Sequence, residues 1–598
     1  MIALLCTLNA RFVHSSLALY SLKAQVRDLE GQVDFRIREF TINRPSMDLL
    51  SRIHREKPDR LFLGLYIWNR EETLRLVRDI HRIHPQLPVY LGGPEATHDA
   101  PALLRDEPAI TGIFMGEAED TFRSFWLARL SLPREQPDPV VPGLMVRNHS
   151  FQSREPLDPG ALVFAYPPEA LRKLENHILY YEASRGCPFH CAYCLSSVDR
   201  TLRFKPLDQV VQEIQALAEA GVRQVKFVDR TFNVDPRRAV AVWKAIFDLP
   251  ADTRTNFHFE VTGDRMNEDA LRILAAMPAG RVQLEIGVQS CTPEVLERCG
   301  RKTDIRAIER NVRMLKKPGN VHLHLDLIAG LPGETPETFA RSFNRVWAMG
   351  ADQLQLGFLK VLRGSPMEQM APEYGIRYSG TPPYEVLGTD TMDFDHLCEL
   401  KQAEGALETV ANSGLMPATM GRFPVRWPQG PLAFFQTLGQ TLDQPKTVSE
   451  TFLTVLRVLS DREDPADVRS HLLFDWLLAH RHNTIPAFLA PGEQRQFWLE
   501  AVRSGQAVQA LGTRYPGMDG RRMYKELGAM TFETPVYWQG EPVQTREGDP
   551  VVFDYKNRLP GGFPEFFCTD RRAWDSDPEN RKGVNRHDTR SGRTDGPD

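Results

Sequence analysis

Residues 183–200, ASRGCPFHCAYCLSSVDR, decide how the rest of the chain is interpreted. They place Cys187, Cys191 and Cys194 at C-x3-C-x2-C spacing, directly after the strand-like run ILYYEAS. Three thiolates can bind three irons of a 4Fe-4S cluster and leave the fourth iron open to another ligand. A closed zinc site would need a fourth ligand, and His190 is adjacent to Cys191, which makes shared coordination awkward. The spacing therefore favours an iron-sulfur cluster over zinc.

Strand-like and helix-like segments alternate onward from the cysteine motif. After ILYYEAS the strand-like runs are QVKFVD, FHFEVTG, VQLEIGV, HLHLDLIAG and QLQLGFL, separated by amphipathic stretches such as LDQVVQEIQALAEAG and DIRAIERNVRMLKK. Six repeats are too few for the eight-fold TIM barrel. We therefore predict an open, partial (β/α)6 barrel over residues 177–375.

A second alternation fills residues 1–135, upstream of the motif. Its strand-like runs are IALLCTL, VDFRIREF, RLFLGLYIW, PVYLGG and GIFMGE. Crossovers of this length indicate a parallel, doubly wound, Rossmann-like α/β sheet, whose ligand lies beyond the carboxyl ends of the strands. The loops at that edge are residues 9–16, 68–70, 92–97 and 116–119.

The remaining segments differ in composition. Residues 136–176 are rich in proline and charge, and are predicted to be a linker with one short strand, GLMVR. Longer helical patterns, such as DHLCELKQAEGALETVAN and SETFLTVLRVLSD, predict a mostly helical domain over residues 376–575. Residues 576–598 contain one valine as their only large apolar residue, and we expect a disordered tail.

Composition limits the partners. With 42% apolar residues, 25% charged residues and a formal charge of -5 over 598 residues, the chain is typical of globular domains and has no basic field that would favour nucleic acid. No apolar run approaches the roughly 20 residues that span a bilayer, and the N-terminus lacks a signal-peptide pattern. Eight cysteines, three of them clustered, indicate metal binding in a reducing compartment. We expect a cytoplasmic protein that acts on a small molecule, without nucleic acid or membrane partners; its oligomeric state stays open.

The cysteine motif resembles the signature of the radical S-adenosylmethionine (SAM) superfamily. In that family the open iron binds the amino and carboxylate groups of SAM, and the reduced cluster cleaves SAM to a 5′-deoxyadenosyl radical. The resemblance implies that Cys187, Cys191 and Cys194 hold the cluster and that Tyr193 packs near the adenine. It also implies an electron donor such as flavodoxin or ferredoxin.

Two later strand ends agree with this resemblance. LEIGVQS, residues 284–290, is similar to the fourth strand of the family. DLIAGLPGET, residues 326–335, is similar to the fifth strand, where a glycine-bearing end lies along the adenine. On this ground Gln289 and Gly330 are assigned to the SAM site.

Three carboxylates follow or lie on the predicted barrel strands. Asp229, Glu260 and Glu285 can accept hydrogen bonds from the ribose hydroxyls or the ammonium group of SAM. A salt bridge to a neighbouring helix is the alternative for each. The sequence does not decide between the two.

A doubly wound domain ahead of a radical SAM barrel resembles the cobalamin-binding arrangement. The matching strings are NARFVHSSLALYSLKA, LGGPEAT and GEAEDTF, after the first, fourth and fifth strands. Glycines there let the backbone approach a large macrocycle closely, although ordinary turn glycines are the alternative. The resemblance implies cobalamin contacts from Asn9, Ser15, Ser16, Trp68, Gly92, Gly93, Gly116 and Glu117.

One familiar feature of cobalamin domains is missing. The pattern D-x-H-x-x-G, whose histidine replaces the lower axial base, does not occur. His14 lies in the corresponding loop, between Val13 and Ser15, without an acidic neighbour to orient its imidazole. We therefore expect cobalamin to be held without a protein histidine.

The resemblance implies an enzyme that cleaves SAM through the cluster and methylates an unactivated carbon with the help of cobalamin. Rearrangement and ring formation are alternative reactions. Methylthio transfer normally involves a second cluster with three N-terminal cysteines, but only Cys6 precedes Cys187. A cobalamin-binding sensor with an inactive barrel is the alternative from another class, and the intact cysteine triad argues against it.

Overall fold

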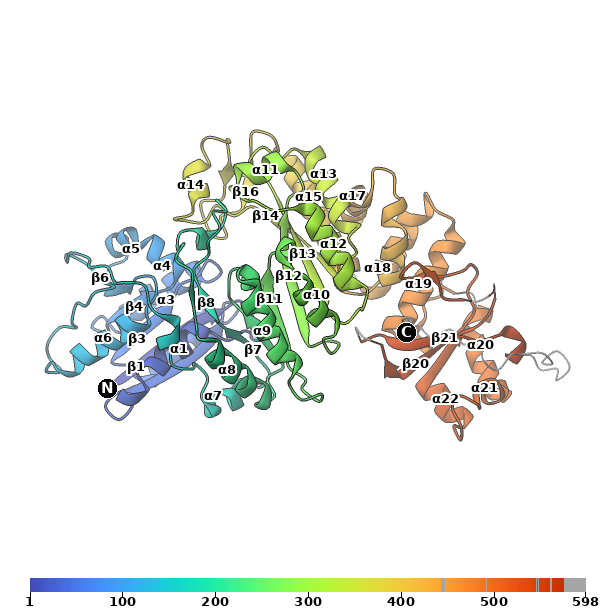
Figure 1. Ribbon diagram of the computed structural model, residues 1–598, viewed down its shortest axis with the longest axis horizontal. Coiled ribbons are helices and arrows are strands. Elements are labelled where there is room, and N and C mark those ends of the chain that lie inside the picture. Colours follow the sequence, from blue (N-terminus) through green and yellow to red (C-terminus); the bar gives the residue numbers. More distant parts are fainter. Residues whose placement is uncertain (443–446, 491, 545, 547, 560–561, 575–598) are drawn as a thin grey trace. The chain divides into compact units, whose positions relative to one another are not determined.

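The computed structural model describes residues 1–442, 447–490, 492–544, 546, 548–559 and 562–574 (Figure 1). The chain divides into two compact units: Met1–Thr335 with Phe358–Asp393, and Pro336–Gly357 with the residues from Phe394 onward. The predicted tail, residues 576–598, lies outside the described residues. Over the described part of the chain, no helix is long and apolar enough to cross a bilayer.

The first unit begins with the predicted doubly wound sheet. Its strand order is β2-β1-β3-β4-β5-β6, in which the first five strands are parallel. The strands are β1 (Ile2–Asn9), β2 (Asp34–Thr41), β3 (Arg60–Gly64), β4 (Val89–Gly92), β5 (Gly112–Phe114) and β6 (Leu144–Val146). The helices are α1 (Leu17–Gln25), α2 (Ser46–Glu56), α3 (Arg70–Ile83), α4 (Pro94–His98), α5 (Ala100–Asp106) and α6 (Glu119–Leu130).

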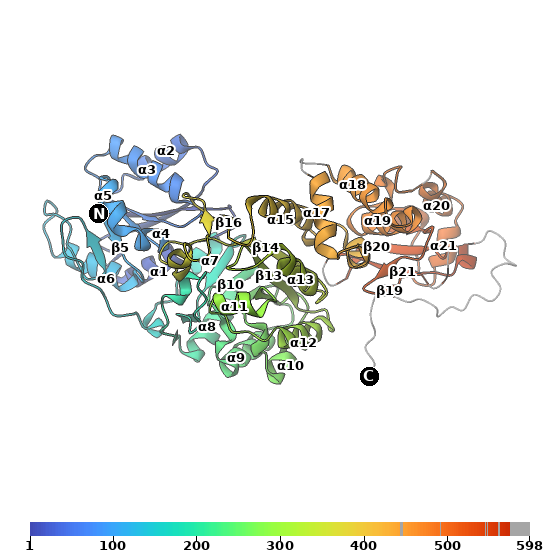
Figure 2. The ribbon, with the colours of Figure 1, turned by 90° about the horizontal axis from the view of Figure 1, so that it is seen from above.

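Helices cover both faces of this sheet, as its almost continuously apolar strands require. Ile53 of α2 and Ile80 of α3 belong to the core on one face. Trp126 of α6 packs with Phe35 and Phe62 on the other face. Figure 2 shows α2 and α3 on one side of the sheet and α1 and α6 on the other. The Rossmann-like prediction is confirmed.

The segment 136–176 was predicted to be a linker with one short strand. Its short strand forms as β6 and pairs antiparallel with β5 at the edge of the sheet. Asp138 anchors the segment, because its carboxylate accepts a hydrogen bond from Arg60 Nε at 2.8 Å and lies 3.1 Å from Arg129 Nε. The hydroxyl of Tyr90 also donates to it. Local composition did not reveal this pairing, because the partners lie far away in the sequence.

The predicted partial barrel follows in the same unit. Its strands β7 (Ile178–Tyr181), β10 (Gln224–Phe227), β11 (Asn256–Val261), β12 (Val282–Gln289) and β13 (His322–Ala329) are parallel, in the order β13-β12-β11-β10-β7. The connecting helices are α8 (Leu207–Glu219), α9 (Pro236–Phe247), α10 (Glu268–Ala275), α11 (Pro293–Arg298) and α12 (Ile305–Lys316). The sixth predicted strand also forms, as β14 (Gln353–Phe358), after α13 (Pro336–Trp347). Helix α13 and all of β14 except Phe358 belong to the second unit.

Buried and partly exposed side chains alternate strictly along β12 and β13. Buried leucines such as Leu284 and Leu323 alternate with polar residues such as Glu285 and His324. Figure 1 shows α9, α10 and α12 along one side of these strands. A hairpin of β8 (Ser184–Arg185) and β9 (Arg203–Phe204) flanks the cysteine loop. The unit ends with α14 (Pro366–Met370) and the strand pair β15 (Arg377–Tyr378) and β16 (Val386–Gly388).

The second unit is mostly helical, as predicted. Its helices are α15 (Phe394–Leu407), α16 (Pro417–Arg422), α17 (Pro431–Thr441), α18 (Val448–Ser460), α19 (Pro465–Ala479), α20 (Gly492–Arg503), α21 (Gln506–Leu511) and α22 (Gly520–Glu526). An antiparallel sheet that the sequence did not predict accompanies them, formed by β17 (Leu527–Met530), β20 (Val551–Arg558) and β21 (Pro564–Cys568). A short pair, β18 (Tyr537–Trp538) and β19 (Glu541–Pro542), lies between these strands in sequence. The pattern of β17, Leu-Gly-Ala-Met, lacks the alternation that marks a strand.

Candidate functional site

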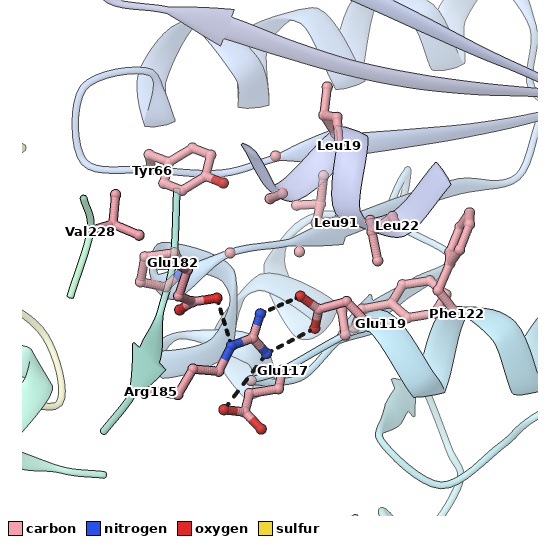
Figure 3. A pocket seen from close by; sticks show the side chains of 18 of the residues that line it. Leu19, Leu22, Tyr66, Leu91, Glu117, Glu119, Phe122, Glu182, Arg185 and Val228 are labelled. Atoms are coloured by element: carbon pink, nitrogen blue, oxygen red, sulfur yellow. Dashed lines mark hydrogen bonds and ion pairs between the residues drawn. The ribbon is translucent and has the colours of Figure 1, made fainter. Parts of the chain in front are cut away.

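A pocket of about 370 Å³ lies between the doubly wound sheet and the start of the barrel (Figure 3). Gly92, Gly93 and Gly116, at the carboxyl ends of β4 and β5, line one side of it. Gly186 and Ser196 line the other side, and both belong to the segment that carries the three cysteines. The pocket therefore joins the ligand edge of the first sheet to the cysteine loop.

The three glycines at this edge differ in what a side chain would meet there. Gly93 has a φ of 102°, and a Cβ there would lie 2.6 Å from the carbonyl oxygen of Leu65. Gly116 has a φ of 60°, but a Cβ there would meet nothing within 4 Å. At Gly92 a Cβ would make only ordinary contacts with Phe114. The fold itself thus requires glycine at position 93, whereas glycine at position 92 leaves room at the pocket.

A buried ion network stands in the pocket wall. Arg185 donates to both oxygens of Glu119, at 2.5 and 3.2 Å, and to Glu182 at 2.8 Å (Figure 3). Burial by itself would raise the pKa of Glu119, but the charge and hydrogen bonds of Arg185 outweigh it, so that the pKa is lowered. None of these three residues was predicted as a site residue. Their sequence signal is position, because Arg185 lies two residues before the first cysteine of the motif and Glu119 ends the predicted loop 116–119.

Glu117 lines the pocket at the predicted place. Its carboxylate is held by Arg203, which donates at 2.8 and 2.9 Å, and it also accepts the backbone N–H of Leu157. Arg185 Nη1 lies 3.7 Å away. Glu117 therefore links the end of the first sheet to the hairpin beside the cysteines.

The polar residues of the first loop hold the loop itself and do not line the pocket. Asn9 donates to the carbonyl oxygen of His14 at 2.9 Å, and Ser15 donates to the carbonyl oxygen of Ile178 at 2.8 Å. The carbonyl oxygen of Ser16 accepts the first N–H groups of α1. The resemblance implies cobalamin contacts from these three residues, and that assignment stays a prediction. Within the chain, their side chains or backbone already have hydrogen-bond partners.

Two further residues at this edge make their contacts within the chain. Trp68 stacks on Tyr66, with ring centroids 4.6 Å apart, and its indole N–H donates to the carbonyl oxygen of Leu8. Tyr66 lines the pocket, and Trp68 is not among the lining residues. Nδ1 of His14 lies 2.7 Å from the hydroxyl of Tyr180 on β7. Burial, with Arg11 and Lys226 nearby, lowers the pKa of His14 and favours the neutral imidazole.

The cysteine loop is held by backbone hydrogen bonds. Cys187 and Cys191 are buried and Cys194 is half-buried. The N–H of Cys187 donates to Asp199 O at 3.0 Å, and the N–H of Cys194 donates to Cys191 O at 3.0 Å. Burial raises the pKa of the Cys187 thiol, and the nearby Cys194 and Cys191 thiols act in the same direction. The three thiols therefore share one neighbourhood.

The chemistry of the donor set suits an iron-sulfur cluster. In a cubane each thiolate binds a different iron, and the segment offers the three thiols of Cys187, Cys191 and Cys194 on one loop.

Arg301 contacts the cysteine loop and was not foreseen. Its Nη1 lies 3.8 Å from Cys191 Sγ and 3.4 Å from the hydroxyl of Tyr193, and its Nη2 donates to the carbonyl oxygen of Gly287. Tyr193 is half-buried, and this desolvation raises the pKa of its phenol. No sequence spacing relates Arg301 to the motif, because 110 residues separate it from Cys191.

Asp229 supports the residues that lead into the cysteine loop. Its side chain is buried, and its two oxygens accept the N–H of Ala183 at 3.0 Å and the hydroxyl of Ser184 at 2.5 Å. Burial raises the pKa of this carboxyl to about 7. Both oxygens hold the strand end that leads into the cysteine loop, and direct contact of Asp229 with SAM stays a prediction.

Glu260 and Glu285 lie on the polar side of the barrel strands. Lys226 of β10 lies 3.0 Å from Glu285 and 3.8 Å from Glu260, and His258 Nε2 lies 3.0 Å from Glu285. Burial would raise the pKa of Glu285, but His258 and Lys226 together lower it to about 2. The ion-pair alternative is thus realised, although the partner lies on a strand and not on a helix.

Gln289 and Gly330 end the two strands predicted to border SAM. Gln289 has a φ of 72° at an irregularity in the β12–β13 register, and its Oε1 is buried without a hydrogen-bond partner in the described structure. Such an orphaned acceptor is a position where a ligand donor would be satisfied. Gly330 has a φ of 83°, and a Cβ there would lie 2.8 Å from Val386 Cγ1.

Comparisons with known proteins point to one group. The chain is 26% identical over 354 residues to a 2-(S-pantetheinyl)-carbapenam-3-carboxylate methyltransferase of Streptantibioticus cattleyicolor, covering 54% of this chain and 50% of that protein. It is 25% identical over 353 residues to the cobalamin-dependent radical SAM methyltransferase TokK of Streptomyces tokunonensis, with the same coverage. The chain thus spans about half the length of these relatives.

Solved structures share the fold. The radical SAM methyltransferase TsrM from Kitasatospora setae, solved with tryptophan substrate and a SAM analogue, matches with a TM-score of 0.54 at 18% identity, over 77% of this chain and 99% of that one. The cobalamin-dependent SAM radical enzyme OxsB, solved with aqua-cobalamin and SAM, also gives 0.54, at 14% identity, over 80% and 79%. At such identities the likeness establishes the fold alone.

Family models match three consecutive parts of the chain. Residues 4–125 match the B12 binding domain, residues 181–346 match the radical SAM superfamily, and residues 372–553 match a protein family of unknown function, DUF4080. The first two matches coincide with the doubly wound sheet and with the barrel that carries the cysteine loop. The chain therefore belongs to the radical SAM superfamily, as a member that carries a cobalamin-binding domain.

Proposed function

We propose that this chain is a cobalamin-dependent radical SAM methyltransferase that methylates an unactivated carbon of a small molecule. The observation that carries the proposal is the shared pocket, bordered by Gly92, Gly93 and Gly116 on one side and by Gly186 and Ser196 of the cysteine segment on the other. The names of the two relatives support methyl transfer. A flavodoxin or ferredoxin is the proposed electron donor.

The chain's own residues fit the three proposed cofactors. Cys187, Cys191 and Cys194 would hold a 4Fe-4S cluster whose open iron binds SAM. When bound, the cluster supplies the electron for reductive SAM cleavage, and cobalamin supplies a methyl group to a carbon that SAM alone cannot methylate. Gln289 and Gly330, at the ends of β12 and β13, are the proposed neighbours of SAM.

The pocket wall suits a macrocycle with an apolar face and amide side chains. Leu19, Leu22, Leu91 and Phe122 provide apolar contact on the side of the first sheet (Figure 3). Carboxylates such as Glu117 can accept N–H groups from amides. These residues would orient cobalamin and exclude water from the space beside the cysteine loop.

The proposal is tested with anaerobically reconstituted full chain, a reductant and SAM carrying a labelled methyl group. We expect 5′-deoxyadenosine from the wild type with or without cobalamin, and labelled product from a cell extract only when cobalamin is present. Cys187→Ala should abolish both activities, because it removes a cluster ligand. Cys398→Ala, at an exposed cysteine of the second unit, is the matched control and should change neither.

Two outcomes would contradict parts of the proposal. Formation of 5′-deoxyadenosine without any product that carries the label would replace methyl transfer by rearrangement or ring formation. Stoichiometric zinc in place of about four irons per chain would exclude the cluster itself.

A further inference from the structure

We infer that Arg301 is a positioning residue for the cluster, and that its guanidinium sets the reduction potential of the cluster by donating to the sulfur of Cys191. This inference rests on the proposed function, because it requires a cluster at Cys187, Cys191 and Cys194. It concerns a residue of the chain that neither the cysteine motif nor the strand motifs include.

The backbone around Arg301 is docked onto the cysteine loop. The carbonyl oxygen of Cys299 accepts the N–H of Ala192 at 2.8 Å. Gly300, with a φ of 67°, packs so closely that a Cβ there would lie 2.7 Å from the carbonyl oxygen of His190. The turn that contains Arg301 is thus attached on both sides of Cys191, and the position of the guanidinium follows from the fold.

The guanidinium has no counter-charge in direct contact. Among the described residues, its hydrogen-bond acceptors are Cys191 Sγ at 3.8 Å, the hydroxyl of Tyr193 at 3.4 Å and the carbonyl oxygen of Gly287. None of these is a carboxylate, and its Nε is buried without a hydrogen-bond partner. For a half-buried guanidinium whose Nε is withdrawn from solvent, a neighbouring anion is stabilising. A cluster held by three thiolates provides one.

The charge of Arg301 shifts the reduction potential of the cluster in one direction. Reduction adds one negative charge to a cluster that is already anionic. A cation and an N–H donor beside a ligating sulfur stabilise the reduced form, more strongly in a buried site than in water. Arg301 should therefore raise the reduction potential and make the cluster easier for its electron donor to reduce.

The test is a redox titration of the reconstituted full chain without SAM, followed by electron paramagnetic resonance of the reduced cluster. Arg301→Met keeps the length of the side chain but removes the charge and the donors. We expect its midpoint potential to fall by at least the equivalent of a tenfold change in the reduction equilibrium, about 59 mV for one electron. Arg301→Lys keeps the charge but loses the planar guanidinium, so its midpoint potential should fall by less.

A matched control is Arg281, a buried arginine of the same unit. It lies directly before β12 and donates to backbone carbonyls such as those of Leu249 and Pro250, not to the cysteine loop. Arg281→Lys should leave the midpoint unchanged. Tyr193→Phe removes only the phenol that Arg301 Nη1 contacts, and should give a small shift in the same direction as Arg301→Lys.

The outcomes separate the inference from the proposed function. An intact cubane with an unchanged midpoint in Arg301→Met would overturn the inference, and weaker SAM binding in that variant would assign Arg301 to SAM alone. If Arg301→Met assembles no cubane, the test rests on Arg301→Lys. A midpoint potential equal to that of the wild type in Arg301→Lys would then overturn the inference. A wild-type chain that assembles no cubane would instead refute the proposed function.

Discussion

Single residues at the pocket edge show how similar sequence features serve different purposes. Gly93 and Gly116 both have positive φ and both follow strands of the first sheet. A side chain at position 93 would collide with the backbone of Leu65, whereas one at position 116 would enter open space. The first glycine is needed for the fold, and the second leaves space for a ligand.

Alanine substitutions separate these two roles. We expect Gly93→Ala to lower the free energy of unfolding by about 2 kcal/mol or more, through left-handed strain and a backbone clash. Gly116→Ala should lower the free energy of unfolding by about 1 kcal/mol, through strain alone. It should weaken hydroxocobalamin binding by more than this small stability loss can explain. Chemical denaturation and absorbance titration measure the two effects. Equal stability losses in the two variants would contradict this assignment.

At the scale of elements, the edge strand β6 depends on one carboxylate. Asp138 has a side-chain exposure of 9%, and it lies between Arg60 and Arg129, exposed by 9% and 1%. The desolvation of these charges is compensated only while the carboxylate remains. The segment 136–176 is therefore attached to the first sheet by charge as well as by strand pairing.

Asp138→Asn should destabilise the first sheet by about 3–5 kcal/mol, because it leaves two buried arginines without their anion. Hydrogen exchange of the β5 and β6 backbone should accelerate first, since this pair forms the edge of the sheet. Asp28→Asn, at the exposed pair with Arg123, is the control and should show no measurable change. Unchanged protection of β6 in Asp138→Asn would refute the anchoring role.

At the scale of the whole first unit, Arg185 connects the doubly wound sheet to the barrel. It lies in the hairpin before the cysteines, and its partner Glu119 begins α6. Because Arg185 lowers the pKa of Glu119 below its usual value near 4.5, this ion pair stabilises the fold above that pH. The contribution is lost as the pH falls through the lowered pKa, when the carboxylate becomes protonated.

Arg185→Met should therefore cost about 3–5 kcal/mol near pH 7, because Glu119 stays buried without its cation. The difference from wild type should shrink as the pH falls. It shrinks first through the pKa of the unpaired Glu119, which burial raises above its usual value in the variant, and then through the lowered pKa of the wild-type pair, because a protonated Glu119 no longer needs a partner. Urea unfolding of the cluster-free chain at several pH values measures this. Arg123→Met, at the exposed pair, should show neither the loss nor the pH dependence. A difference that stays constant with pH would rule out the ion pair as its cause.

The sequence by itself determined the order and class of the two α/β sheets and the placement of the cysteine motif after a strand. These properties depend on periodicity and spacing over a few residues, which local backbone geometry translates directly into strands, helices and loops. The helical character of the second unit followed in the same way. Its small sheet did not, because β17 and β20 pair across more than twenty residues without an alternating pattern.

Only the tertiary structure decided which side chains meet. Arg301 reaches Cys191 across 110 residues, and Arg185 reaches Glu119 across 66. Asp229, Asn9 and Ser15 are polar residues at the correct edge, but the fold directs their hydrogen bonds inward. The physical reason is that a buried polar group must find a partner somewhere in the chain, and the identity of that partner depends on how distant elements pack, not on local spacing.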